Sequence, residues 1–137
     1  IALAAAGAAL NTDLDRMPEG LETLVGERGI TLSGGQKQRV SLARALLDPR
    51  NIILLDDVLS AVDHDTERFL VERIYALAQG RATVLVSHRI SALEKANRIL
   101  VLDHGRLVDT GTHAELITRD GPYRDAWALQ RTTGDAQ

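Results

Sequence analysis

The chain has 137 residues, which suits a single domain with a hydrophobic core of its own. Hydrophobic residues make up 45% and charged residues 26%, as in ordinary soluble proteins, and a net charge of -3 gives no electrostatic reason to expect nucleic acid. The absence of cysteine excludes disulfides and thiolate metal sites, and it fits a reducing compartment.

The first third of the chain predicts two helices separated by a loop. Residues 1–16 are Ala-rich and predict a helix whose apolar run is too short to span a bilayer and lacks the basic flank of a signal peptide. Because the chain opens inside this run, we expect it to be a fragment of a longer protein. Residues 17–29 carry one proline and three glycines and predict a loop. Val40, Ala43 and Leu47 follow at helical spacing and predict a second helix.

Two strands are predicted next, with a helix between them. Residues 51–57, NIILLDD, and 82–88, ATVLVSH, are short apolar runs of the kind found in strands buried on both faces. Residues 66–79 predict a helix that stops before Gly80. The side chains expected to face inward from this helix are Phe69, Leu70, Ile74 and Leu77.

The remaining elements are shorter. Ser91 and Glu94 have the spacing of a capping box for a short helix, and residues 98–111 predict a hairpin that turns at Gly105. Thr112 and Glu115 form a further capping box ahead of the terminal helices. Helices that alternate with buried strands indicate an α/β fold with a parallel sheet. We expect residues 51–55, 82–86 and 99–102 to be neighbouring strands of it.

The stretch LSGGQ at residues 32–36 precedes the second helix. Ser33 and Gln36 have the spacing of a capping box, which would explain them without any function. A cap does not need Gly34 and Gly35, however, since glycine weakens a helix by roughly 1 kcal/mol per residue relative to alanine. What the glycines provide is unobstructed backbone N–H at the positive end of the helix dipole, which suits a phosphate group.

Polar side chains close both predicted strands. Asp56 and Asp57 end the first strand, and Ser87 and His88 end the second. Ligands of α/β sheets bind beyond the carboxyl ends of the strands, so Asp56 stands where a Mg²⁺ ligand is expected. A single polar residue at a strand end is often only part of a loop. An anion-binding helix followed by two such strand ends indicates a nucleotide site.

These motifs resemble those of the ATP-binding cassette (ABC) ATPases over nearly the whole chain. LSGGQ matches the family signature, IILLDD (52–57) resembles Walker B, SAVD (60–63) the D-loop and SHR (87–89) the switch-histidine loop. TLVGERG (23–29) looks like the X-loop typical of exporters. The resemblance implies a partial P-loop NTPase core, with parallel strands flanked by helices, plus part of the α-helical signature subdomain. Its implied divisions are 1–48 (helical, with X-loop and signature), 49–130 (core) and 131–137 (frayed tail).

The resemblance also implies roles for individual residues and the cofactors ATP and Mg²⁺. Asp56 would hold Mg²⁺, and His88 would hydrogen-bond the γ-phosphate. Asp57 stands where the family usually carries its catalytic glutamate. The residues implied to bind nucleotide across a head-to-tail dimer, or to line its seam, are Ser33, Gly34, Gly35, Gln36, Ser60 and Asp63. His64, His104 and His113 are expected to have no such role.

Two departures from the family pattern affect these expectations. The phosphate loop with its lysine, the adenine-stacking aromatic and the Gln loop are not in this sequence, so we do not expect the chain by itself to bind ATP tightly or to hydrolyse it. Asp57 is one methylene shorter than glutamate, which resembles the degenerate half of a heterodimeric exporter.

The first interpretation is therefore the ATPase portion of an exporter at the cytoplasmic face of the cell membrane. The chain would be attached there through a transmembrane domain that it lacks, contacted through Glu27 and Arg28. Two alternatives remain open. One is a soluble ABC ATPase of the chromosome-maintenance or translation-factor type, although such relatives lack TLVGERG and often have basic surfaces. The other is a regulatory half-site that binds ATP and hydrolyses little of it, which is compatible with the first interpretation.

Overall fold

The computed structural model describes residues 1–26, 29–47 and 50–134. The elements form two compact units, Ile1–Val86 and Ser87–Gln137. In the first unit the helices are α1 (Ala2–Gly7), α2 (Asn11–Leu14), the 3-10 turn η1 (Gly20–Glu22), α3 (Gly34–Leu47) and α4 (His64–Ala78), and the strands are β1 (Ile52–Asp56) and β2 (Ala82–Val86). The second unit holds η2 (Ile90–Ala92), β3 (Ile99–Asp103), β4 (Arg106–Gly111), α5 (His113–Leu116) and α6 (Pro122–Gly134).

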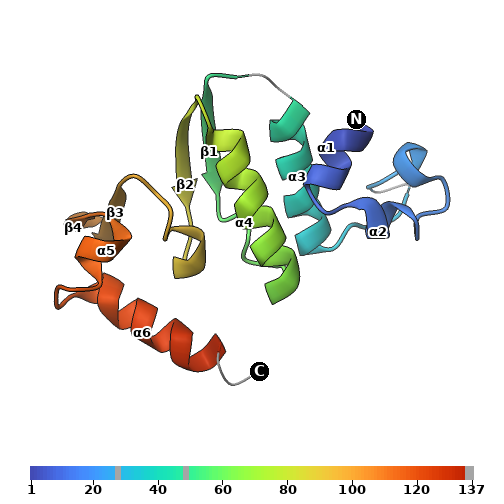
Figure 1. Cartoon of the computed structure of the whole chain (residues 1–137). Coiled ribbons are helices and arrows are strands. Elements are labelled where there is room, and N and C mark those ends of the chain that lie inside the picture. Colours follow the sequence, from blue (N-terminus) through green and yellow to red (C-terminus); the bar gives the residue numbers. More distant parts are fainter. Residues whose placement is uncertain (27–28, 48–49, 135–137) are drawn as a thin grey trace. The chain divides into compact units, whose positions relative to one another are not determined.

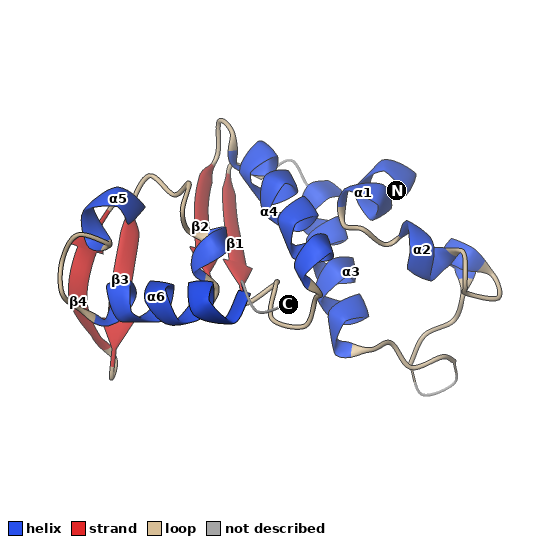
Figure 2. Cartoon of the chain, turned by 60° about the horizontal axis from the view of Figure 1, so that its bottom comes forward, coloured by secondary structure: helices blue, strands red, loops and turns tan. Residues whose placement is uncertain are grey.

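The first unit is built on a parallel strand pair. β1 and β2 lie in register from Ile52 opposite Ala82 to Asp56 opposite Val86, which confirms the predicted parallel pairing. Helix α4 runs alongside this pair, with α3 beyond it and α1 against α3 (Figures 1 and 2). The largest fully buried side chains of this unit are Leu42 on α3, Leu59 in the turn after β1, and Leu70 on α4.

The strands are not buried on both faces as predicted. Ile53 and Leu55 are buried, but Ile52 and Leu54, which point the other way, are 73% and 70% exposed. The reason is that successive strand residues point to opposite faces, and the described helices of the first unit cover only one of them. Residues on both faces of the strands are apolar, but only those on the face covered by helices are buried.

The third predicted strand pairs differently from the expectation. β3 forms an antiparallel hairpin with β4, and in the described residues it makes no ladder with β1 or β2. His104 and Gly105 connect the two strands with φ of 45° and 74°, the backbone of a tight hairpin turn. This turn supplies β3 with a local partner, and it confirms the predicted hairpin.

The helix predicted over residues 1–16 is broken. α1 ends at Gly7, and Ala9 has a left-handed φ of 56°, which no α-helix can contain. The chain restarts as α2 after this bend, and Leu10 is buried at the junction. The high helix propensity of alanine predicted a continuous helix here. The observed break at Ala9 accompanies the burial of Leu10 instead.

Two smaller expectations also fail. Phe69 was expected to face inward but is 39% exposed, and the Arg73 guanidinium lies 5.1 Å from the centre of its ring. The short helix expected after Ser91 does not form, because the segment is a single 3-10 turn, Ile90–Ala92, which includes Ser91 itself. In contrast, Leu70 and Ile74 are buried as predicted, and Thr112 and Glu115 form the expected capping box.

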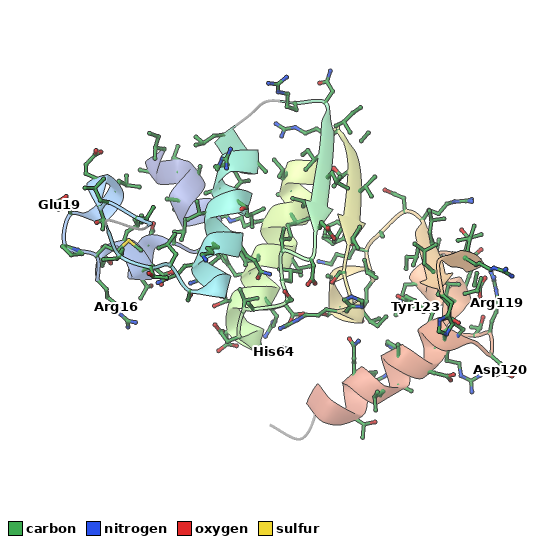
Figure 3. The ribbon with its side chains drawn as sticks, turned by 180° about the vertical axis from the view of Figure 1, so that it is seen from behind. Arg16, Glu19, His64, Arg119, Asp120 and Tyr123 are labelled. Atoms are coloured by element: carbon green, nitrogen blue, oxygen red, sulfur yellow. The ribbon has the colours of Figure 1, made fainter. Side chains whose placement is uncertain are left out.

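The second unit has its own apolar cluster. Ile90, Ile99, Leu116 and Tyr123 are buried together, with Trp127 packed against them. His113 Nδ1 lies 2.9 Å from the Tyr123 hydroxyl, so this histidine joins α5 to the start of α6. His64, by contrast, is exposed at the first turn of α4 (Figure 3). Among the described residues, no helix has the length and apolar character needed to cross a membrane.

Candidate nucleotide site

The N-terminus of α3 is closed by a complete capping box. The Ser33 backbone N–H donates to Gln36 Oε1 at 2.8 Å, and the Gln36 N–H donates to Ser33 Oγ at 3.2 Å. This arrangement confirms that Ser33 caps the helix, as its spacing predicted. It satisfies one helix donor and leaves neighbouring backbone N–H groups of the first turn directed outward from the helix end.

The two glycines of LSGGQ have different surroundings. A Cβ atom at Gly34 would meet nothing closer than Ala61 Cβ at 3.9 Å, so its backbone borders open space. A Cβ atom at Gly35 would lie 2.5 Å from the Ala61 carbonyl oxygen, which no side chain can tolerate. Gly34 thus leaves the helix end accessible to an anion, and Gly35 allows α3 to approach the turn that follows β1.

Asp13 on α2 supports this helix end. Its Oδ1 accepts from Gln36 Nε2 at 2.9 Å, and its Oδ2 accepts from Arg39 Nη2 at 2.6 Å. Burial disfavours the charged carboxylate, but the hydrogen bonds from Gln36 and Arg39 outweigh that effect and hold the pKa of Asp13 below its usual value. Because Gln36 Nε2 is held by Asp13, Gln36 Oε1 is left facing Ser33, which orients the cap.

The carboxylates after β1 lie at the carboxyl end of the strand pair. Asp56 is exposed there, opposite Val86. Asp57 is half-buried, its N–H donates to the Val86 carbonyl at 2.9 Å, and its φ of 48° is left-handed. Aspartate is among the few residues found in this region, and such outliers gather at functional sites.

The D-loop residues divide between two contacts. Ser60 is joined to α3, because its Oγ accepts from Gln38 Nε2 at 2.7 Å. Asp63 instead caps α4, accepting from the Thr66 backbone N–H at 2.9 Å. That backbone hydrogen bond, with a second from the Thr66 hydroxyl, lowers the pKa of Asp63. The structure therefore gives Asp63 a helix-capping function of its own, which its place in the SAVD motif did not predict.

His88 belongs to the second unit, where its side chain is exposed. Its backbone is held by α6: the His88 carbonyl accepts from Gln130 Nε2 at 2.7 Å, and the Ile90 N–H donates to Gln130 Oε1 at 2.9 Å. Gln130 thus spans the segment that contains His88. That His88 and Asp56 share one edge of the site stays a prediction.

The sequence did not predict three residues that hold candidate site residues within their own units: Asp13 and Gln38 in the first unit, and Gln130 in the second. Each acts through side-chain hydrogen bonds to residues 19 to 42 positions away, which local patterns do not encode. Glu27 and Arg28, expected at a membrane-domain contact, lie outside the described residues.

The donor set fits a nucleotide with its metal. Gly34 leaves room at a helix N-terminus for a phosphate, and Asp56 offers exposed carboxylate oxygens, the ligands Mg²⁺ prefers. Among the described residues no three acidic or histidine side chains gather into a metal cage. Mg²⁺ bound to nucleotide does not require one, because water and phosphate oxygens complete its shell.

Comparison with known proteins identifies the family. A family model described as ABC transporter matches residues 6–60. The ATP-dependent lipid A-core flippase of Aromatoleum aromaticum is 46% identical over 85% of this chain and 20% of its own length. The probable multidrug resistance ABC transporter ATP-binding/permease protein YheI of Bacillus subtilis is 48% identical over 93% of this chain and 22% of its own.

A solved structure extends the likeness to the fold. The structure of a bacterial Atm1-family ABC exporter with ATP bound is 45% identical, with a TM-score of 0.85 over 94% of this chain and 23% of that one. The chain belongs to the ABC transporter family, and its fold is a partial ABC ATPase fold. More narrowly, it corresponds to part of an exporter-type nucleotide-binding domain, and it spans about a fifth of the length of the curated relatives it matches.

Proposed function

We propose that this chain is the signature-bearing part of an ATPase domain that drives export across a membrane by ATP-dependent dimerisation and hydrolysis. The observation that carries the proposal is the N-terminus of α3, where Ser33 and Gln36 form a reciprocal cap beside the open backbone of Gly34. Such a helix end binds the terminal phosphate of ATP through backbone N–H groups and the helix dipole. The transported substrate would be chosen by the membrane domain.

Each site residue has a proposed role in this scheme. Ser33, Gly34 and Gly35 contact the γ-phosphate of an ATP held by the opposite subunit, and Gln36 supports them. Asp56 holds Mg²⁺, which when bound neutralises developing charge on the phosphates. His88 hydrogen-bonds the γ-phosphate in this chain's own site. Ser60 and Asp63 line the seam between the subunits. Regions 1–48 and 49–130 are the helical and core parts of the domain, and 131–137 is its tail.

The partner is a second ABC ATPase subunit in a head-to-tail dimer. We place the domain at the cytoplasmic face of the membrane, with Glu27 and Arg28 at the membrane domain. The acidic net charge of -3 and the exporter relatives favour this over a soluble nucleic-acid-associated ATPase.

A regulatory role for this chain's own Walker B site is the second candidate. Asp57 is shorter than glutamate, and its backbone is fixed by the bond from its N–H to Val86, so its carboxylate has limited reach toward an attacking water. The partner would then carry the glutamate, making the dimer a heterodimer.

The test of the main proposal is Gly34→Asp in the full-length transporter. The open space at Gly34 accepts the side chain, so the variant places a carboxylate against the phosphate without displacing the Ala61 turn, as Gly35→Asp would. ATP-driven closure and hydrolysis should be lost while nucleotide affinity stays mostly intact. Gly34→Ala is the matched control and should keep substantial hydrolysis. Normal turnover in Gly34→Asp would overturn the phosphate role.

A further inference from the structure

The side-chain amide of Gln38 fastens α3 to the turn after β1. Its Nε2 donates to the Asp57 carbonyl at 2.9 Å and to Ser60 Oγ at 2.7 Å, and its Oε1 accepts from the Ala61 N–H at 3.1 Å. Only one orientation of the amide satisfies all three contacts, because two partners are acceptors and one is a donor. Ser60 Oγ in turn donates to the Asp57 carbonyl at 3.2 Å.

A second contact lies one helical turn away on α3. Gly35 packs so closely against the Ala61 carbonyl that a Cβ atom there would lie 2.5 Å from that oxygen. Gly35 and Gln38 are three residues apart and therefore share a helix face. The contacts of Gly35 and Gln38 fix both the position and the orientation of α3 against the turn from Asp57 to Ala61. We therefore expect this turn and the first turn of α3 to move together.

We infer that Gln38 is a positioning residue that couples the two ATP sites of the dimer. The inference rests on the proposed function, in which the N-terminus of α3 serves the partner's ATP and Asp57 borders this chain's own. Displacement of the Asp57–Ala61 turn at one site is then transmitted through Gln38 to the phosphate-binding helix end at the other. Gln38 touches neither nucleotide.

Two substitutions in the full-length transporter test the inference. Gln38→Leu removes all three hydrogen bonds at similar volume. It should lower kcat for ATP about tenfold while KM for ATP stays within about twofold, because alignment at the transition state is lost and not ground-state binding. Ser41→Ala, an exposed position on the same helix, is the matched control and should keep wild-type kcat.

Gln38→Glu keeps the shape of the side chain, so it keeps the test valid if Gln38→Leu fails to fold. Its carboxylate still accepts from Ala61 but cannot donate to Asp57 or Ser60. Its kcat should therefore fall as in Gln38→Leu, with KM for ATP again little changed. A residue that merely fills space would tolerate Gln38→Glu and keep wild-type kcat.

Amide hydrogen exchange at Ala61 provides a readout independent of activity. Exchange should accelerate in Gln38→Leu and not in Ser41→Ala. Unchanged exchange, or wild-type kcat in Gln38→Leu while Gly34→Asp is inactive, would overturn the coupling role and leave the proposed function standing. Normal hydrolysis in Gly34→Asp would instead refute the proposed function, and the inference with it.

Discussion

At the scale of single residues, Asp57 shows how a side chain and its backbone serve different ends. Its carbonyl accepts from Gln38, its N–H donates to Val86, and its φ is 48°. None of these contacts uses the carboxylate. A substitution of Asp57 therefore leaves the two backbone hydrogen bonds of the turn in place, so it tests the carboxylate alone.

The first prediction concerns that carboxylate. In the heterodimer proposed as the second candidate, Asp57→Asn should change turnover by less than about twofold, whereas removing the partner's proposed glutamate should lower it by about 10²–10⁴-fold, the usual contribution of a general base. Asp57→Glu should raise hydrolysis at this chain's site. ATPase assays on the reconstituted pair provide the measurement. An equal collapse in Asp57→Asn and in the partner's variant would indicate two equivalent working sites.

Asp13 supports a second prediction at this scale. Its carboxylate and Arg39 are only 17% and 14% exposed, so their 2.6 Å pair is little screened by solvent. Asp13→Asn should lower the free energy of unfolding at pH 7 by about 1–3 kcal/mol, the range for charge-assisted hydrogen bonds.

The sign of the pH dependence follows from the lowered pKa of Asp13. A depressed carboxyl pKa stabilises the fold above the unfolded value, about 3.9, and this stability is lost as the pH falls through the folded pKa. The difference between wild type and Asp13→Asn should therefore shrink below about pH 4. Urea unfolding followed by circular dichroism at both pH values tests this. A constant difference would mean that the charge of Asp13 does not contribute.

At the scale of elements, α6 holds the His88 segment through one side chain. Gln130 bonds the His88 carbonyl and the Ile90 N–H, so both ends of a three-residue stretch are fixed. Gln130→Leu should lower kcat for ATP several-fold with KM little changed, because His88 would lose its fixed direction. Leu129→Ala, at an exposed neighbouring position, is the control. Wild-type kcat in Gln130→Leu would show that α6 does not position His88.

The elements also show how far the sequence could be read. α3, α4, the β1–β2 pair and the hairpin turning at Gly105 were all predicted, because caps, glycines and apolar runs are local signals. The capping box of Ser33 and Gln36 was predicted on the same grounds. The sequence did not predict the bend at Ala9 or the hydrogen bonds made by the side chains of Gln38 and Gln130. They depend on distant partners, and an alanine or a glutamine carries no local mark of such a partner.

At the scale of the whole molecule, apolar strand residues face outward. Ile52, Leu54, Val84 and Val86 lie on one face of the β1–β2 pair and are all exposed. A contiguous exposed apolar face of this kind is typical of a surface that binds another protein surface or aggregates.

The corresponding prediction is self-association of the isolated 137-residue chain, measured by light scattering. Replacing Leu54 and Val84 together with threonine, which keeps β propensity, should reduce scattering markedly. Leu129→Thr on α6 removes an exposed leucine elsewhere and should have little effect. A monodisperse wild-type monomer would contradict the prediction.

The hydrogen bonds of the Gln38 and Gln130 side chains should also respond little to ionic strength. Both are made by neutral amides bonded to neutral backbone or hydroxyl groups. Dissolved salt ions screen interactions between net charges, but they weaken hydrogen bonds between neutral groups very little. The three hydrogen bonds that join Gln38 to the turn after β1 should therefore persist from dilute buffer to molar salt, while the Arg119–Asp109 ion pair of the second unit weakens.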